Sequence, residues 1–241
     1  MSKAPARTPT GRCCTSTSAA RSPRPCTPTA RPPAPSRKPP GSAHWSWTSG
    51  WPEHPYPAQL DDAETAYRWL LAQGYQPQNI GSTGHSIGGT LAIMLPLRLL
   101  ANGEPTPGAI VSISPWTDLT IANPKVDENE ENDKMLSRNT LELFRGAWLQ
   151  DPALDFADPK ISLVNADLTG LPPTVVHYGE YETLAGDGAE LGHRLTEFKV
   201  TSAVHPMPEG QHSFILAAGR VPEVDQAIAQ MGQWLRLHLG A

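Results

Sequence analysis

The chain has 241 residues, which suits one sizeable domain, and its 39% hydrophobic and 18% charged content is enough for a packed core. Eight of the 19 Lys/Arg and none of the 24 Asp/Glu fall within residues 1–50, so the remaining 11 basic residues face 24 acidic ones, a formal charge of −13. A basic, proline-rich segment therefore precedes an acidic remainder, and we treat the two separately.

Cysteine usage and hydropathy predict the compartment. All three cysteines (Cys13, Cys14 and Cys26) lie in the basic segment, and their number and spacing fit neither a closed disulfide set nor a zinc site. The acidic remainder has none, as is usual in a reducing compartment. The N-terminus lacks the apolar core of a signal peptide, and no run of about 18 apolar residues predicts a membrane span. We therefore expect a soluble, cytoplasmic protein.

From Asp61 onward, helix-like and strand-like patterns alternate. The stretch "LDDAETAYRWLLAQG" predicts a helix with Asp61 as its N-cap, Glu64 at the capping-box position and Gly74 as its stop. The remaining predicted elements, in chain order, are a strand over 79–83, a helix over 86–103, a strand over 108–115, a helix over 137–150, a strand over 172–179, a helix over 185–198, a strand over 199–205 and a helix over 221–240. Such alternation predicts an α/β fold with a mostly parallel sheet and flanking helices.

The stretch "TGHSIGG" is the strongest chemical signal. Residues 84–88 fit G-x-S-x-G between a predicted strand and a predicted apolar helix, which is the context in which this motif presents a nucleophilic serine. We expect both Gly84 and Gly88 to be needed because the turn is tight. Ser86 is then the candidate nucleophile, and the backbone N–H of Ile87 the candidate oxyanion donor. The alternative is a glycine-rich turn without chemistry.

A serine nucleophile needs a base, and the base needs a carboxylate to orient it. His212, in the loop after the last predicted strand, is the candidate base, and His205 is a weaker rival. Glu182, after the preceding predicted strand, is the candidate acid, with Asp187 as its rival. The other histidines considered are expected to have packing or surface roles: His85, His177, His193 and His238.

Several stretches together resemble the hormone-sensitive lipase family of bacterial α/β-hydrolase esterases. They run in family order from Pro52 onward: "PEHPYPAQLDDA", "GHSIGG", "SPWTDLT", "ADLTGLPPT", "GEYETL" and "EGQHSF". The resemblance implies an α/β-hydrolase fold in which Ser86 is the nucleophile, Glu182 the acid and His212 the base, although the family more often has Asp at the acid position.

The resemblance also implies an activity and its requirements. Members of the family cleave carboxylic esters with short to medium acyl chains, and some open lactones, through an acyl-enzyme and without a metal or organic cofactor. The implied partner is a small-molecule ester. We expect no nucleic-acid partner and no membrane partner, and homo-oligomerisation stays open. Residues 130–150 would form a lid or pocket wall, although plain core packing explains their apolar face equally well.

Residues 1–51 depart from the family, whereas residues 52–241 form the expected catalytic region. The family's H-G-G-G loop, which supplies most oxyanion donors, and its first four strands have no counterpart here, so activity is expected to be impaired. This segment can be a disordered linker or a basic tail that binds nucleic acid, although it contains no recognisable nucleic-acid-binding module.

A third interpretation of this segment uses the genetic code. Read one base out of step, residues 13–20 can encode a strand followed by an H-G-G-like loop. In the same frame, residues 44–52 can encode "L-x-L-D-x-R-L-A" directly before "PEHPYPA". We therefore hypothesise that residues from about Arg12 to Trp51 are an out-of-frame translation. The chain as a whole is interpreted as an esterase. The alternatives are a non-catalytic, ligand-binding relative and a peptidase of the same fold.

Overall fold

The computed structural model describes residues 43–45, 53–151 and 153–239, which build one five-stranded parallel sheet. The strands are β1 (Ala43–Trp45), β2 (Ile80–His85), β3 (Ala109–Ile113), β4 (Thr174–Gly179) and β5 (Ser202–Met207), and they lie side by side in chain order. The connections from β2 onward pass through helices, as parallel neighbours require. The predicted α/β architecture, a parallel sheet with flanking helices, is confirmed.

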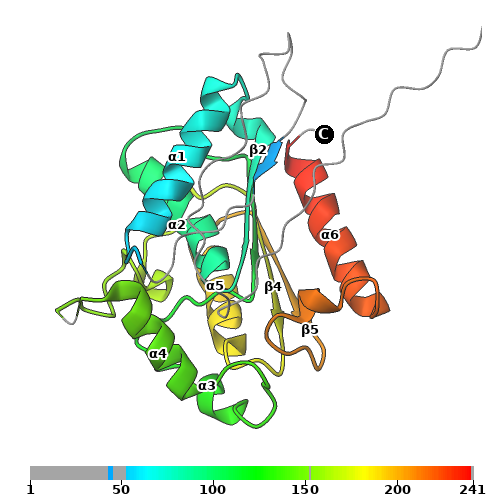
Figure 1. The fold of residues 1–241 in the computed structure, drawn as a ribbon. Coiled ribbons are helices and arrows are strands. Elements are labelled where there is room, and N and C mark those ends of the chain that lie inside the picture. Colours follow the sequence, from blue (N-terminus) through cyan, green and yellow to red (C-terminus); the bar gives the residue numbers. More distant parts are fainter. Residues whose placement is uncertain (1–42, 46–52, 152, 240–241) are drawn as a thin grey trace, which may run out of the picture.

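Helices cover both faces of the sheet (Figure 1). They are α1 (Ala58–Ala72), α2 (Ile87–Ala101), the short α3 (Lys125–Glu128), α4 (Arg138–Leu149), α5 (Ala185–Glu197) and α6 (Pro222–Leu239). Alternate strand residues face opposite layers, so Ile110 and Val176 join the larger core with α1, α2 and α5, whereas Val111 and Val175 pack with α6. The core therefore has two parts, one on each side of the sheet.

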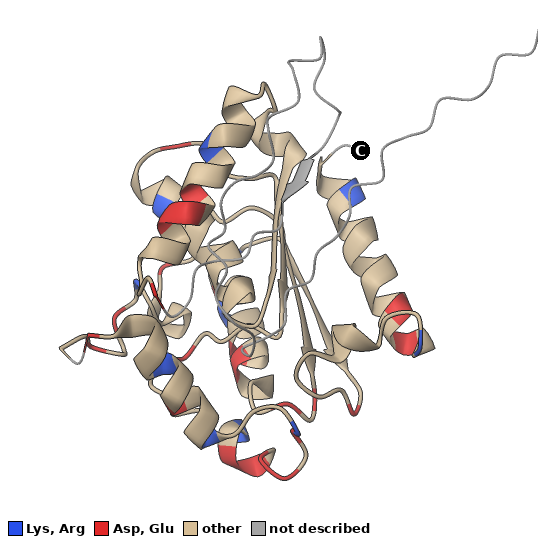
Figure 2. Ribbon diagram, viewed as in Figure 1, with Lys and Arg blue, Asp and Glu red and all other residues tan. Residues whose placement is uncertain are grey.

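Charged side chains are confined to the helices and loops. None of the five strands contains Lys, Arg, Asp or Glu, and Figure 2 shows β2 to β5 free of both charge colours. This pattern is typical of a parallel sheet that is buried on both faces. Within the described ranges, no helix is both long enough and apolar enough to cross a membrane.

The start of α1 differs from the sequence prediction. The helix begins at Ala58 rather than after Asp61, and the backbone N–H groups of Leu60 and Asp61 donate to Pro57 O at 2.9 and 3.0 Å. Asp61 does not cap the helix; its carboxylate pairs with Arg98 of α2 at 2.5 Å. The early start is a tertiary effect, because it buries Gln59 and Leu60 against the rest of the core.

The sequence predicted no strand before Pro52, and that prediction is wrong for β1. Ala43–Trp45 pairs in parallel with Ile80, Gly81 and Ser82 of β2. Such pairing uses only main-chain N–H and C=O groups, which an edge strand offers to any extended segment, so a hydrophobic pattern was not required. The other residues of the out-of-frame hypothesis lie outside the described residues, and the boundary between 1–51 and 52–241 stays a prediction.

Candidate active site

Ser86 lies in the sharp turn between β2 and α2. Its φ of 58° and ψ of −129° are unusual for a residue with a side chain, and its backbone N–H donates to Ile113 O at 2.8 Å. The hydrogen bond to β3 helps to hold this strained conformation, as expected for a serine presented at the end of a parallel sheet. The strand–turn–helix context that the motif predicted is present.

The glycine requirement around Ser86 differs from the prediction at one position. A Cβ on Gly84 would lie 2.0 Å from Gly88 O, so only glycine fits there. Outside its chain neighbours and the nearby backbone of α2, a Cβ on Gly88 would meet no described atom within 4 Å, so close contacts do not require glycine at 88, contrary to the expectation. The tight contact falls one residue later, because a Cβ on Gly89 would lie 3.0 Å from both Ile113 O and Ser112 Oγ.

His212 is brought next to Ser86 from a distant part of the chain. It lies between β5 and the 3-10 helix Phe214–Ala217, is 5% exposed, and its Nε2 is 3.1 Å from Ser86 Oγ. That distance is within hydrogen-bonding range, with the direction set by the imidazole tautomer. The following residue, Ser213, has a φ of 65° and turns the chain into the 3-10 helix.

Glu182 lies on the other side of His212. It follows β4, is fully buried, and its Oε2 is 3.5 Å from His212 Nδ1. This separation is close enough for an ion pair with a protonated imidazole but longer than a good hydrogen bond. The same Oε2 accepts a hydrogen bond from Ser114 Oγ at 2.7 Å, and Oε1 has no hydrogen-bond partner among the described residues.

The two loops that carry Glu182 and His212 meet through paired glycines. A Cβ on Gly179 would lie 2.3 Å from Gly210 O, and one on Gly210 would lie 2.7 Å from Met207 Cγ. The backbone N–H of Tyr181 donates to Gly210 O at 2.9 Å. The absence of side chains at these positions therefore lets the loops after β4 and β5 pack directly against each other.

The rival acid has a different environment. Asp187, on α5, is 1% exposed, and its Oδ2 accepts hydrogen bonds from the backbone N–H groups of Thr117 and Asp118 at 2.7 and 2.8 Å. Burial raises the pKa of Asp187 to about 7, and the nearby Asp118 carboxylate acts in the same direction. Its bonds tie α5 to the loop after β3 rather than to a histidine.

The remaining histidines near the site are mostly stacked on one another. His205 packs on His177 with ring centroids 4.7 Å apart, and burial lowers the pKa of His177 to about 3, with His205 as the second cause. His85 lies beside His212, with ring centroids 4.9 Å apart, and burial lowers its pKa to about 3 as well. His85 therefore stays neutral at neutral pH, and its closeness to His212 was not predicted.

The amide proposed for the oxyanion hole is at a helix N-terminus. Ile87 is the first residue of α2, so its backbone N–H is one of the four that have no acceptor within the helix. The helix dipole places partial positive charge at the same point. The segment that would hold further donors by analogy with the family lies outside the described residues.

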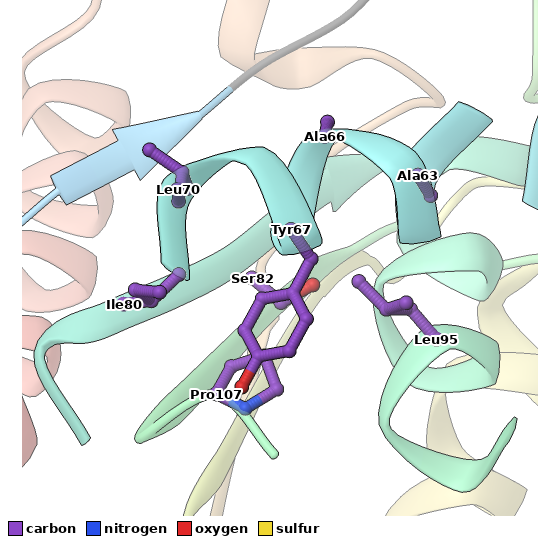
Figure 3. Close-up of a pocket in the computed structure, with 9 residues that line it drawn as sticks. Ala63, Ala66, Tyr67, Leu70, Ile80, Ser82, Leu95 and Pro107 are labelled. Atoms are coloured by element: carbon purple, nitrogen blue, oxygen red, sulfur yellow. The ribbon is translucent and has the colours of Figure 1, made fainter. Parts of the chain in front are cut away.

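A shallow apolar pocket lies away from this site. Figure 3 shows it between α1, β2 and α2, where Tyr67 and Leu95 line it together with Pro107. Its hydroxyl groups are engaged, since Tyr67 donates to Pro105 O and Ser82 donates to Ala92 O. It therefore offers little polar chemistry. In the described part of the chain, no cluster of three or more His, Cys, Asp or Glu side chains is arranged to hold a metal ion.

The residues predicted as a lid comprise the loop before α4 and α4 itself. Arg145 of α4 donates to Leu119 O at 2.7 Å, and Trp148 Nε1 donates to Gln59 Oε1 of α1 at 3.1 Å. These contacts join α4 to two other parts of the fold. Whether residues 130–150 cover a substrate pocket stays a prediction.

Comparison with known proteins identifies the family of the chain. Residues 51–216 match the family model described as the alpha/beta hydrolase fold. The chain is 32% identical over 183 residues to an esterase of Acinetobacter venetianus, covering 76% of this chain and 60% of that protein. It is 36% identical over 192 residues to the carboxylesterase/phospholipase LipF of Mycobacterium tuberculosis, covering 77% and 50%. The chain thus spans half to three fifths of these relatives.

Solved structures give the same result. A mutant of the esterase E40 superposes with a TM-score of 0.75 and 35% identity, over 78% of this chain and 63% of that one. An esterase from the bacterial hormone-sensitive lipase family superposes with a TM-score of 0.75 and 34% identity, over the same shares.

Proposed function

This chain belongs to the hormone-sensitive lipase family of α/β-hydrolase fold proteins, and from that premise we propose that it hydrolyses carboxylic esters. The relatives it matches include an esterase, a carboxylesterase/phospholipase and an acetyl-hydrolase. We propose esters or lactones with short to medium acyl chains as substrates. The observation that carries the proposal is the 3.1 Å separation between His212 Nε2 and Ser86 Oγ.

The proposed reaction begins with attack by Ser86 Oγ on the ester carbonyl carbon, while His212 Nε2 takes the hydroxyl proton. The tetrahedral intermediate then expels the alcohol, to which His212 returns the proton, and an acyl-enzyme remains. A water molecule, deprotonated by the same imidazole, then attacks the acyl carbon, and the imidazolium returns a proton to Ser86 Oγ as the bond to the acid breaks. Each proton transfer uses one nitrogen atom, Nε2, so the orientation of the ring matters throughout.

Glu182 is proposed to hold that orientation and to stabilise the imidazolium. Its Oε2 is 3.5 Å from His212 Nδ1 in the free protein, and such contacts often shorten when the imidazole becomes charged. The backbone N–H of Ile87 is proposed as one donor to the oxyanion. A single donor of this kind is typically worth ~10²–10³ in kcat, so a site lacking the other donors is expected to be slow.

Labelling with a fluorophosphonate probe tests the proposal without knowledge of the natural substrate. We expect covalent labelling of Ser86, no labelling of Ser86→Ala, and strongly reduced labelling of His212→Gln. Ser213→Ala is the matched control, because Ser213 is next to His212 but has no proposed chemical role. Labelling that persists in Ser86→Ala would contradict the proposal.

Turnover assays then separate the alternatives. Hydrolysis of p-nitrophenyl butyrate, without release of p-nitroaniline from peptide anilides, is the result expected for an esterase. The reverse preference would indicate a peptidase of the same fold. A folded protein that neither reacts with the probe nor hydrolyses either substrate would indicate a non-catalytic relative.

A further inference from the structure

The carboxylate of Glu182 has few direct restraints. Its Oε2 contacts Ser114 Oγ and His212, and its Oε1 has no hydrogen-bond partner among the described residues. A glutamate side chain has three rotatable bonds, and a buried carboxylate with an unpaired oxygen is costly. The backbone that carries Glu182 must therefore be held firmly for the carboxylate to stay against His212.

Asn129 holds this backbone from one side. It follows α3, is 6% exposed, and its Nδ2 donates to both Glu180 O and Glu182 O at 2.9 Å. Both protons of one amide group are thus directed at the loop after β4. An amide can make this pair of bonds, whereas a carboxylate of the same shape cannot donate to either carbonyl.

Asp133 holds the next residue of the loop. It is 4% exposed, and its Oδ2 accepts from the backbone N–H of Thr183 at 2.9 Å and from Thr183 Oγ1 at 3.3 Å. Its Oδ1 accepts from the backbone N–H groups of Met135 and Leu136 at 2.9 and 3.1 Å. The donors offset the cost of burying this carboxylate, and they aim it at the residue directly after Glu182.

The two side chains belong to one compact turn. The backbone N–H of Asp133 donates to Asn129 O at 2.8 Å, which places the residues one helical turn apart. Between them lie Glu130, Glu131 and Asn132, all exposed. The turn therefore directs its two buried polar side chains at the loop carrying Glu182, and directs its intervening residues at solvent.

We propose that Asn129 and Asp133 are positioning residues that clamp the backbone of Glu182 and Thr183, so that the Glu182 carboxylate stays against His212 Nδ1. This inference rests on the proposed function and deepens it. The loop before α4, which the sequence predicted as part of a lid, thereby supports the loop that carries Glu182. A displacement of about 1 Å in a catalytic group can cost ~10² in rate, which sets the scale of the effect.

Steady-state kinetics of Asn129→Asp and Asp133→Asn with p-nitrophenyl butyrate test the clamp. We expect kcat to fall about 10- to 100-fold with KM nearly unchanged, because binding does not involve Glu182. The matched controls are Asn132→Asp and Glu131→Gln, which make the same chemical changes at the exposed positions and should keep wild-type kcat. Equal losses in variants and controls would overturn the proposal.

A double-mutant comparison separates positioning from a general structural role. In a Glu182→Gln background the acid is already lost, so Asn129→Asp should lower kcat little further. Fully additive losses would overturn the proposal. The acidic limb of kcat/KM should also move to lower pH in Asn129→Asp, because an imidazolium with a less well placed carboxylate loses stabilisation. An unshifted limb would count against the clamp.

The NMR resonance of the His212 Nδ1–H proton, which faces Glu182 Oε2, makes the test independent of turnover. We expect this resonance to lie further upfield in Asn129→Asp and Asp133→Asn than in the wild type and the two controls, because the contact with the carboxylate is weakened. If the protein lacks esterase activity but this difference is present, the proposed function fails and the clamp stands. An unchanged His212 Nδ1–H resonance in both folded variants would overturn the clamp. Should Asn129→Asp fail to fold, Asp133→Asn carries the test.

Discussion

Ser86 is held in a strained backbone conformation, and close contacts require only one of the two glycines that the motif names. Gly84 meets Gly88 O so closely that any side chain would collide with main chain. Gly88 itself has open space around its Cβ direction among the described residues. At the scale of single residues, the two glycines of G-x-S-x-G therefore have unequal structural roles.

This inequality is testable by paired substitution. Gly84→Ala should destabilise the fold by about 3 kcal/mol or more, since the clash is with backbone and cannot be relieved by a side-chain rotation. Gly88→Ala, in the first turn of α2, should range from neutral to a gain of about 1 kcal/mol through helix propensity. Urea unfolding measures both. Similar losses in the two variants would contradict the reasoning.

Between elements, the principal polar tie is the one between α5 and the loop after β3. The Oδ2 of Asp187 accepts from the N–H groups of Thr117 and Asp118, all three residues being buried. The pKa of Asp187 is raised from 3.8 to about 7, with burial as the largest cause. The folded protein therefore holds this proton more tightly than the unfolded chain.

The consequence is a pH-dependent stability with a defined sign. Between about pH 4 and pH 7 the folded state keeps the Asp187 proton while the unfolded state loses it, so this residue's contribution to the free energy of unfolding falls as pH rises. The slope is about 1.4 kcal/mol per pH unit. This contribution to the pH dependence of the free energy of unfolding should disappear in Asp187→Asn. It should persist in Glu190→Gln, an exposed control on the same helix.

Thermal or urea unfolding at several pH values between 4 and 8 gives the comparison. Subtracting the variant curve from the wild-type curve isolates Asp187 from the opposing contributions of His85 and His177, whose pKa values are lowered to about 3. Parallel curves for the wild type and Asp187→Asn would show that the carboxyl is ionised in the folded protein throughout this range.

At the scale of the whole molecule, the described sheet is thin on the β1 side of the site. Among the described residues, β1 pairs with three of the six residues of β2, the strand that leads to Ser86. Partly covered parallel edges favour association between chains. The out-of-frame hypothesis accounts for the absence of an H-G-G-G motif from the sequence before Pro52.

We therefore predict that the chain as written is poorly soluble and hydrolyses p-nitrophenyl butyrate slowly, and that a frame-corrected version is soluble and active. Each oxyanion donor that the segment before Pro52 does not supply is expected to lower kcat by ~10²–10³. Ser86→Ala in the frame-corrected chain is the control for background hydrolysis. Resequencing the coding DNA decides the hypothesis, because an intact frame without an insertion or deletion near Pro52 would exclude it.

Local sequence determined the types and order of the longer helices and the strands from residue 58 onward, although it predicted neither the short α3 nor the 3-10 helices. It also indicated the loops that carry the candidate site residues. Hydrophobic periods and turn residues act over a few positions, so β3, β4, α5 and α6 were predicted within a few residues. For the same reason Ser86, Glu182 and His212 were selected as candidates from strand ends and loops alone.

Tertiary structure decided which candidates meet, because those contacts join residues far apart in the chain. Ser86 and His212 are 126 positions apart, and only the folded sheet puts their atoms 3.1 Å from each other. Tertiary contacts also place Glu182, and not Asp187, next to His212. They likewise account for the early start of α1 and for the hydrogen bonds from Asn129 and Asp133 to the loop that carries Glu182. The stretch that contains Asn129 and Asp133 is polar and has no periodicity, so the sequence predicts only an exposed loop there. Both side chains are buried because they bind the distant loop that carries Glu182, and only the folded structure shows this.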